Sequence, residues 1–176
     1  EQWLGRAVVL ATEEPVANRI LGIDGPNRAW NAVDCLYFSL PEKELPATSP
    51  ILHLDGSGMG PINNLTFLST LSDCAPPGRA LASASVIGKK EMGMDQVVEL
   101  ANQQLRTWFG ENVKKWDFLR SYRISHAVPS CDVVPHLETK KNGVYRCGDY
   151  FGLPSIDSAL CSGRLVAESI IASNKE

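Results

Sequence analysis

Residues 144–172 limit the possible folds of this chain more than any other stretch. Val144–Cys147 is a short, mostly apolar run of β-prone residues, which predicts a buried strand. Gly148 and Asp149 end this strand, and an irregular loop continues as far as Pro154. A strand that stops at Gly-Asp and leads into a helix is typical of α/β folds, in which helices pack on a sheet.

A helix is predicted to follow the loop. Ser155 is suited to cap it, and the acidic Asp157 would interact favourably with the helix dipole in the first turn. Such a helix start presents N–H groups without a partner inside the helix, so it attracts electron-rich oxygens and developing negative charge. An ordinary βα unit with a capped helix has the same features, and that alternative stays open here. Apolar and small residues recur at helical spacing at Ile156, Ala159, Leu160, Gly163, Val166, Ala167, Ile170 and Ile171.

This segment resembles the C-terminal flavin-binding motif of the FAD-dependent amine oxidase superfamily, which includes the phytoene desaturase-like enzymes. The family pattern is a strand, Gly-Asp, a variable loop, Ser-Met-Glu-Gly-Ala and then Ser-Gly within a helix. The matching residues here are Gly148-Asp149, residues 155–159 and Ser162-Gly163. One departure is Ser158, because the family usually has glycine there and a side chain could crowd the cofactor.

The resemblance implies that FAD is the cofactor. It places Asp149 at the ribityl or pyrophosphate part of FAD and the backbone N–H of Ile156 at the pyrimidine edge of the flavin. That N–H would stabilise the negative charge of the reduced ring. No catalytic side chain is assigned, since the cofactor carries most of the chemistry. The residues expected at the cofactor are Ala11, Thr12, Gly148, Asp149, Tyr150, Ser155, Ile156 and Ala159.

The start of the chain predicts a second strand–helix pair. Arg6–Thr12 forms a continuous apolar strand, and a helix begins near Pro15 and continues to Leu21. A buried strand of this kind needs neighbours on both sides. In the resembling family it is a late strand of the FAD-binding domain, whose sheet partners come from an earlier Gly-x-Gly-x-x-Gly unit.

That glycine loop is not found in this sequence. The nearest candidate is residues 56–60, but Pro61 stands at the third glycine position and no helical pattern follows, so it is interpreted as a turn. We therefore expect the chain to be the C-terminal part of a longer flavoprotein, inactive alone and partnered by its N-terminal remainder.

The middle of the chain predicts a sheet with one long helix. The strands are expected at Trp30–Leu40, Ile51–Leu54, Leu65–Ser69, Ala80–Ile87 and Phe118–Val128, and the helix at Asp95–Phe109. This order resembles the substrate domain of the same family.

The predicted fold class is mixed α/β. One part belongs to a Rossmann-like FAD-binding domain, and a mixed β-sheet forms the substrate domain. The expected division is a late strand and helix of the FAD-binding domain in 1–25, the substrate domain in 26–127 and the C-terminal FAD-binding motif in 128–176.

Composition excludes several classes of function. The net charge of −3 and the lack of a dense basic patch argue against a nucleic-acid partner. The five cysteines are widely spaced without a Cys-x-x-Cys pair, which argues against structural zinc or a disulfide framework and favours a reducing, intracellular compartment. No apolar run has membrane-spanning length, although peripheral membrane contact is compatible with the sequence. Similarity to plant members suggests a plastid.

Other reactive side chains have simpler interpretations. His126 lies near the position where family members approach the flavin, but a histidine satisfied within a strand is the preferred interpretation. Lys89 and Lys90 are interpreted as a solvated pair, and Cys147 and Cys161 as small packing residues.

Three functions remain open. The leading hypothesis is hydride transfer from a C–N or C–C bond of a small or lipid-like substrate to the flavin. The alternative is a non-catalytic relative that binds a partner or a lipid-like pigment, which Ser158 and the few distinctive titratable residues favour. A third is a self-contained α+β binding domain without cofactor, although the unpaired opening strand counts against it.

Overall fold

The structure is a computed structural model, and it describes residues 4–23, 29–46, 48–88, 91–130, 140–141 and 143–173. Its contacts divide the chain into two compact units. One unit, here the discontinuous unit, consists of Glu1–Trp30 and Val128–Glu176, and the other, the inserted unit, is Asn31–Ala127. Helices and both parallel and antiparallel strand pairs occur, so the predicted mixed α/β class is confirmed.

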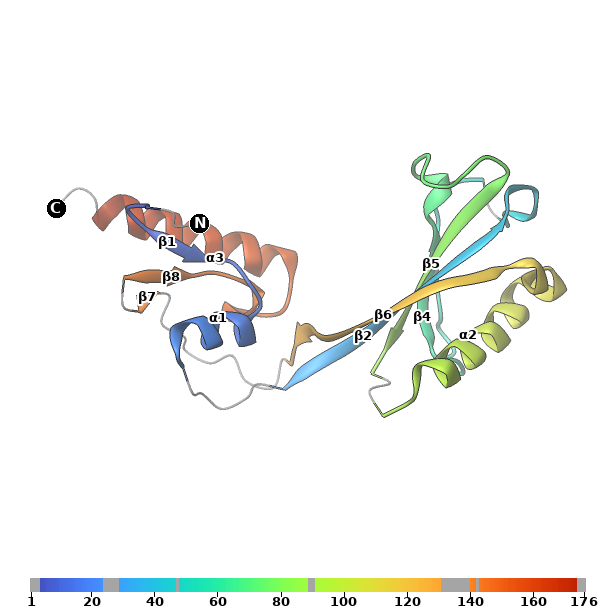
Figure 1. The fold of residues 1–176 in the computed structure, drawn as a ribbon, viewed down its shortest axis with the longest axis horizontal. Helices are drawn as coiled ribbons and strands as arrows, with labels where there is room; N and C mark the ends of the chain where they lie inside the picture. Colours follow the sequence, from blue (N-terminus) through green and yellow to red (C-terminus); the bar gives the residue numbers. More distant parts are fainter. Residues whose placement is uncertain are drawn as a thin grey trace. The chain divides into compact units, whose positions relative to one another are not determined.

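The sheet of the discontinuous unit joins two distant segments of sequence (Figure 1). Its strands lie in the order β1 (Val8–Leu10), β8 (Val144–Arg146) and β7 (Lys140–Lys141). β1 and β8 are parallel, with Val8 opposite Val144, whereas β7 is antiparallel to β8. The two segments that the sequence analysis compared with a flavin domain are thus hydrogen-bonded neighbours.

Two helices cover this sheet, α1 (Glu14–Leu21) and α3 (Ile156–Ser173). Successive residues of a strand point to opposite faces, and β8 uses this alternation. The Tyr145 hydroxyl lies 3.4 Å from the hydroxyl of Ser173 in α3. Arg146 instead donates through Nη1 to Oδ1 of Asn18 in α1, at 3.0 Å. The helices therefore pack on opposite faces of the sheet.

The opening strand is shorter and less buried than predicted. We expected a buried strand over Arg6–Thr12, but β1 comprises only Val8–Leu10. The side chains of Val8 and Val9 are 52% and 42% exposed. The reason is that β1 lies at the edge of its sheet and pairs with β8 alone within the described residues.

The apolar face predicted for α3 is also only partly correct. Ser162 and Val166 are its buried residues, whereas Ile156 and Leu160 are 82% and 69% exposed. Small residues and one hydroxyl therefore face the sheet, and much of the large apolar surface lies outside. Among the described residues, no helix combines the length and apolar character needed to cross a membrane.

The inserted unit is a five-stranded sheet with one helix against it (Figure 1). Its strand order is β3-β4-β5-β2-β6, and the pairs β3–β4, β4–β5 and β2–β5 are antiparallel. The predicted strands and helix are confirmed, with ends that shift by up to three residues. The elements are β2 (Trp30–Pro41), β3 (Leu52–Leu54), β4 (Ile62–Phe67), β5 (Arg79–Ile87), α2 (Met94–Phe109) and β6 (Asp117–Pro129).

Four short 3-10 helices were not predicted from the sequence. They are η1 (Glu42–Glu44), η2 (Leu68–Thr70), η3 (Gly110–Lys115) and η4 (Asp149–Phe151). Three follow strands and η3 extends the end of α2, which is where tight single turns commonly occur.

The core of the inserted unit lies between its sheet and α2. β2 alternates strictly, so Leu36, Phe38 and Leu40 are fully buried while their neighbours are only half-buried. Val97 and Leu105 of α2 belong to the same cluster and are also fully buried. This pattern buries one face of the sheet, which is the main stabilising contribution in such a unit.

Two polar contacts fix this packing. Gln104 of α2 accepts a hydrogen bond from the Ile62 N–H at 2.7 Å and donates to the Ile62 carbonyl at 3.1 Å. Asp34, only 3% exposed, accepts two hydrogen bonds of 2.8 Å from the guanidinium of Arg123, joining β2 to β6. Buried polar side chains of this kind are stable because their hydrogen bonds are satisfied.

Candidate functional site

The predicted site residues meet where two parallel strands end. Ala11 and Thr12 follow β1, and Gly148 follows β8 by two residues. The Cys147 N–H donates to the Leu10 carbonyl at 3.1 Å, which extends the pairing to this edge. Ligands of α/β folds commonly bind beyond the carboxyl ends of parallel strands. The structure therefore brings the two predicted segments to one edge.

The Gly148–Asp149 segment forms a closed turn. The Phe151 N–H donates to the Gly148 carbonyl at 3.3 Å, and the Gly152 N–H donates to the Asp149 carbonyl at 3.2 Å. Gly148 has extended backbone, but a Cβ there would lie 2.3 Å from Cε1 of Tyr150. Glycine is required because the Tyr150 ring occupies that space. Asp149 is half-buried at the head of this turn.

Tyr150 forms the base of the turn. Its side chain is 1% exposed, and its ring centre lies 4.8 Å from that of Phe151. Burial raises the pKa of its phenol to about 12. The hydroxyl has no hydrogen-bond partner within the described residues. In this structure Tyr150 therefore packs beneath the turn and supports Asp149.

The start of α3 has the open amides expected of it. The Ser155 hydroxyl accepts a hydrogen bond from the Ser158 N–H at 3.0 Å, so the predicted N-cap is confirmed. The Ala159 N–H donates to the Ser155 carbonyl at 3.1 Å. No hydrogen bond from the N–H of Ile156 or Asp157 is found within the described residues, and Ile156 is 82% exposed. These two N–H groups can therefore donate hydrogen bonds to a ligand oxygen or nitrogen.

Ser158, the departure from the family pattern, turns towards the preceding loop. Its hydroxyl lies 3.1 Å from that of Ser155. A Cβ built on Gly152 would lie 2.8 Å from the Ser158 hydroxyl, so this side chain occupies the space beside Gly152. The glycine at 152 leaves room for the serine at 158.

Sequence analysis placed Ser162 in the Ser-Gly pair of the motif but missed its contact, which links the turn to the helix. Its hydroxyl accepts a hydrogen bond from the Gly148 N–H at 2.9 Å and lies 3.0 Å from the Gly148 carbonyl and 2.9 Å from the Ala159 carbonyl. Ser162 is 5% exposed. The sequence signals were its place in that motif and a hydroxyl residue at a position that helical spacing places on the sheet-facing side.

Two buried charged residues were also missed. Glu14 and Arg146 are 7% and 4% exposed, and they come from α1 and β8. Besides its bond to Asn18, Arg146 places its guanidinium carbon 5.8 Å from the ring centre of Phe151. Arg146 therefore connects α1 to the turn that carries Asp149.

The remaining candidates lie elsewhere or have no distinctive environment. His126 is exposed in the inserted unit, and Lys89 and Lys90 lie outside the described residues. Burial raises the pKa of the Cys147 thiol, which disfavours a reactive thiolate, and Cys161 is exposed. No group of histidine, cysteine and carboxylate side chains in the described parts of the chain could hold a metal ion.

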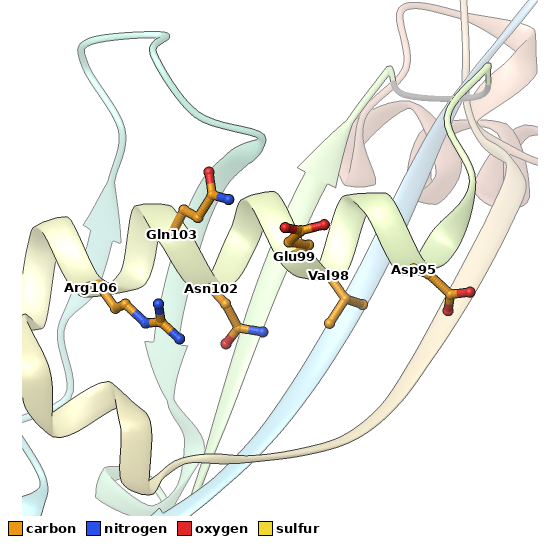
Figure 2. A pocket seen from close by; sticks show the side chains of 6 residues that line it. All are labelled: Asp95, Val98, Glu99, Asn102, Gln103 and Arg106. Atoms are coloured by element: carbon orange, nitrogen blue, oxygen red, sulfur yellow. The ribbon is translucent and has the colours of Figure 1, made fainter.

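Hollows of the inserted unit do not involve the predicted site residues. One of about 380 Å³ lies along the surface of α2, where Asp95, Glu99, Asn102 and Arg106 lie on successive turns (Figure 2). All of its lining residues belong to this single helix. Since a ligand there would be held from one side, we assign it no site.

Comparisons with solved structures support the fold. A protein of Pyrococcus furiosus is 14% identical to this chain, with a TM-score of 0.65. The matched region covers 97% of this chain and 42% of that protein's chain. A candidate protoporphyrinogen oxidase from Exiguobacterium sp. 255-15 is 13% identical, with a TM-score of 0.65, over 93% of this chain and 40% of that one. An oxidoreductase from Methanosarcina mazei is 18% identical, with a TM-score of 0.62, over 88% of this chain and 37% of that one. This chain thus spans about two fifths of their length.

Sequence comparison identifies the family. Comparison with curated proteins gave no match. The profile of one family, described as flavin-containing amine oxidoreductase, matches residues 5–171, which is nearly the whole chain. This match includes both strands of the parallel pair, the turn at Gly148 and the start of α3. The chain belongs to the flavin-containing amine oxidoreductase family.

Proposed function

We propose that this chain is the C-terminal part of an FAD-dependent oxidoreductase that removes a hydride from a small or lipid-like substrate. The observation that carries the proposal is the family match over residues 5–171. FAD is the cofactor that this family implies. When bound, it would accept a hydride from a C–H bond next to a C–N or C–C bond of the substrate, which would become C=N or C=C as a proton leaves the neighbouring atom. The two electrons would then pass to oxygen or a quinone.

The residues at the strand ends fit a role in holding the flavin. The unpartnered amides of Ile156 and Asp157 suit an electron-rich ring edge, where they would stabilise negative charge. Asp149 can accept hydrogen bonds from hydroxyl groups of the cofactor. Ser158 does not oppose this role, since its hydroxyl lies against Ser155 and Gly152.

The exposed apolar residues support the view that further chain completes the site. Val8 and Val9 of the edge strand and Ile156 of α3 are 42–82% exposed. Solved relatives are more than twice as long as this chain. We propose that an N-terminal remainder pairs with β1 and supplies the adenine and pyrophosphate contacts. A plastid location, which the resemblance suggests, and peripheral membrane contact are part of the same proposal.

Flavin absorbance of the protein at its full encoded length tests the proposal. The purified protein should be yellow, or should become so after incubation with FAD and removal of the excess. Residues 1–176 alone should bind FAD far more weakly, because most of the cradle would be missing. A well-folded full-length protein that stays colourless with added FAD would overturn the enzyme hypothesis.

A non-catalytic relative is the second candidate. The exposed Leu160 and Ile171 of α3 favour it, because they provide an apolar surface for a partner. Chemical reduction of the bound flavin, without any substrate, separates the two candidates. A catalytic protein should hold FAD that dithionite bleaches and air restores, whereas a non-catalytic relative should hold none.

A further inference from the structure

Ser162 makes three polar contacts within the described part of the discontinuous unit. A serine in the middle of a helix usually returns its hydroxyl bond to a carbonyl three or four residues earlier. Here the hydroxyl also reaches the backbone of another element. It accepts from the Gly148 N–H at 2.9 Å and lies 3.0 Å from the Gly148 carbonyl. Its single hydrogen is donated to that carbonyl or to Ala159, at 2.9 Å.

This contact ties the Asp149 turn to α3. Gly148 immediately precedes Asp149, and Ser162 lies on the same helix as the open amides of Ile156 and Asp157. Fixing Gly148 to the second turn of α3 therefore fixes the spacing between the carboxylate and the amides. The Tyr150 ring closes the other side, because it occupies the space where a Gly148 side chain would stand.

We propose that Ser162 is a positioning residue for flavin binding, which sets Asp149 relative to the start of α3. This inference rests on the proposed function. In this role Ser162 allows two contacts with the cofactor to form at once. Asp149 would bind a hydroxyl-bearing chain, and the Ile156 N–H would bind an electron-rich ring edge. Both contacts must form together, so a small displacement of one group relative to the other weakens binding strongly.

The test compares Ser162→Ala, Ser162→Thr and Ser169→Ala in the protein at its full encoded length. Ser162→Ala removes the hydroxyl and leaves the Gly148 N–H without its partner. Ser162→Thr retains the hydroxyl. Ser169→Ala makes the same chemical change at an exposed position of the same helix, so it controls for helix propensity.

Binding of added FAD is measured by quenching of its fluorescence, and the visible spectrum and reduction potential of the bound flavin are recorded. Ser162→Ala should weaken FAD binding about tenfold or more, and should shift the spectrum or potential of the flavin that still binds. Ser162→Thr should restore most of the affinity, and Ser169→Ala should match the unmodified protein.

The outcomes separate the two levels of the argument. If the unmodified protein takes up no FAD, the proposed function fails and this inference fails with it. If the unmodified protein binds FAD and Ser162→Ala binds it with equal affinity and an unchanged spectrum, only the positioning role is wrong, even if the melting temperature falls. Should Ser162→Ala not fold, Ser162→Cys replaces it, because a thiol is a weaker hydrogen-bonding group at the same position.

Discussion

Replacing Gln104 by alanine should destabilise the inserted unit, although alanine has the higher helix propensity. Gln104 is 9% exposed and makes both hydrogen bonds of the Ile62 backbone, with the N–H at 2.7 Å and the carbonyl at 3.1 Å. Ile62 is fully buried, so water cannot replace either bond. Each unsatisfied buried group costs about 1–3 kcal/mol, and we expect a total loss of about 3 kcal/mol.

The assay is urea unfolding followed by tryptophan fluorescence. Trp116 lies in the core of this unit and Trp108 packs against it, so the signal reports on its unfolding. Gln103→Ala is the matched control, because Gln103 is exposed on the same helix, and its stability should stay within about 0.5 kcal/mol of the unmodified protein.

A third variant separates hydrogen bonding from volume. Gln104→Met fills similar space without polar groups, so it should retain most of the loss seen for Gln104→Ala. If Gln104→Ala and Gln103→Ala unfold at the same urea concentration, the two hydrogen bonds do not stabilise this unit as argued. If Gln104→Met restores full stability, the loss came from the cavity and not from the unsatisfied backbone.

Three further changes test other contacts. Asp34→Asn should lower stability by about 2 kcal/mol in urea unfolding, since it removes the charge that holds the two hydrogen bonds from Arg123; an unchanged midpoint would contradict this. Tyr150→Phe should be neutral or slightly stabilising at pH 7. Between pH 10 and 12 it should lose about 2 kcal/mol less stability than the unmodified protein, because the phenol pKa of about 12 keeps the folded state protonated while the unfolded state ionises. Parallel melting curves of the two proteins across that range would refute the burial of the hydroxyl. Gly148→Ala should destabilise by about 1–3 kcal/mol, because its Cβ would lie 2.3 Å from the Tyr150 ring, whereas Gly163→Ala should stabilise by about 1 kcal/mol, because nothing lies within 4 Å of that position. A destabilising Gly163→Ala would show that another segment packs on α3 there.

The sheet of the inserted unit could be predicted well because its strands follow simple patterns. β2 and β5 alternate buried and half-buried residues over most of their length. Turn residues such as Pro76, Pro77 and Gly78 separate the strands clearly. Strand order could not be predicted, since pairing of β5 with both β4 and β2 depends on contacts across the whole unit.

The parts of the candidate site that depend on local backbone preferences could be predicted from the sequence. The Ser155 cap follows from local preference, and Gly-Asp after a strand indicates a turn. The buried contacts of Ser162 and Gln104 were missed for a shared reason. Hydrophobic periodicity predicts that a polar residue of a helix is exposed. Both side chains are nevertheless buried, because they bind the backbone of a neighbouring element.

The length of β1 was overestimated for a different reason. The apolar run Arg6–Thr12 has strand propensity throughout, but a strand extends only where a neighbour offers hydrogen bonds. β8 contributes three residues, and β1 has three residues paired with them. Its Val8 and Val9 keep the composition of a central strand although the described chain provides only one neighbour.

The parallel pairing of β1 with β8 has a consequence for the order of folding. Val8 pairs with Val144, so the pair can form only after the intervening residues have been synthesised. The inserted unit, Asn31–Ala127, is contiguous and can collapse first. Its collapse brings the two flanking segments nearer and reduces the loop entropy that their pairing must overcome. Pulsed hydrogen exchange during refolding should therefore protect β2 and β5 before β8.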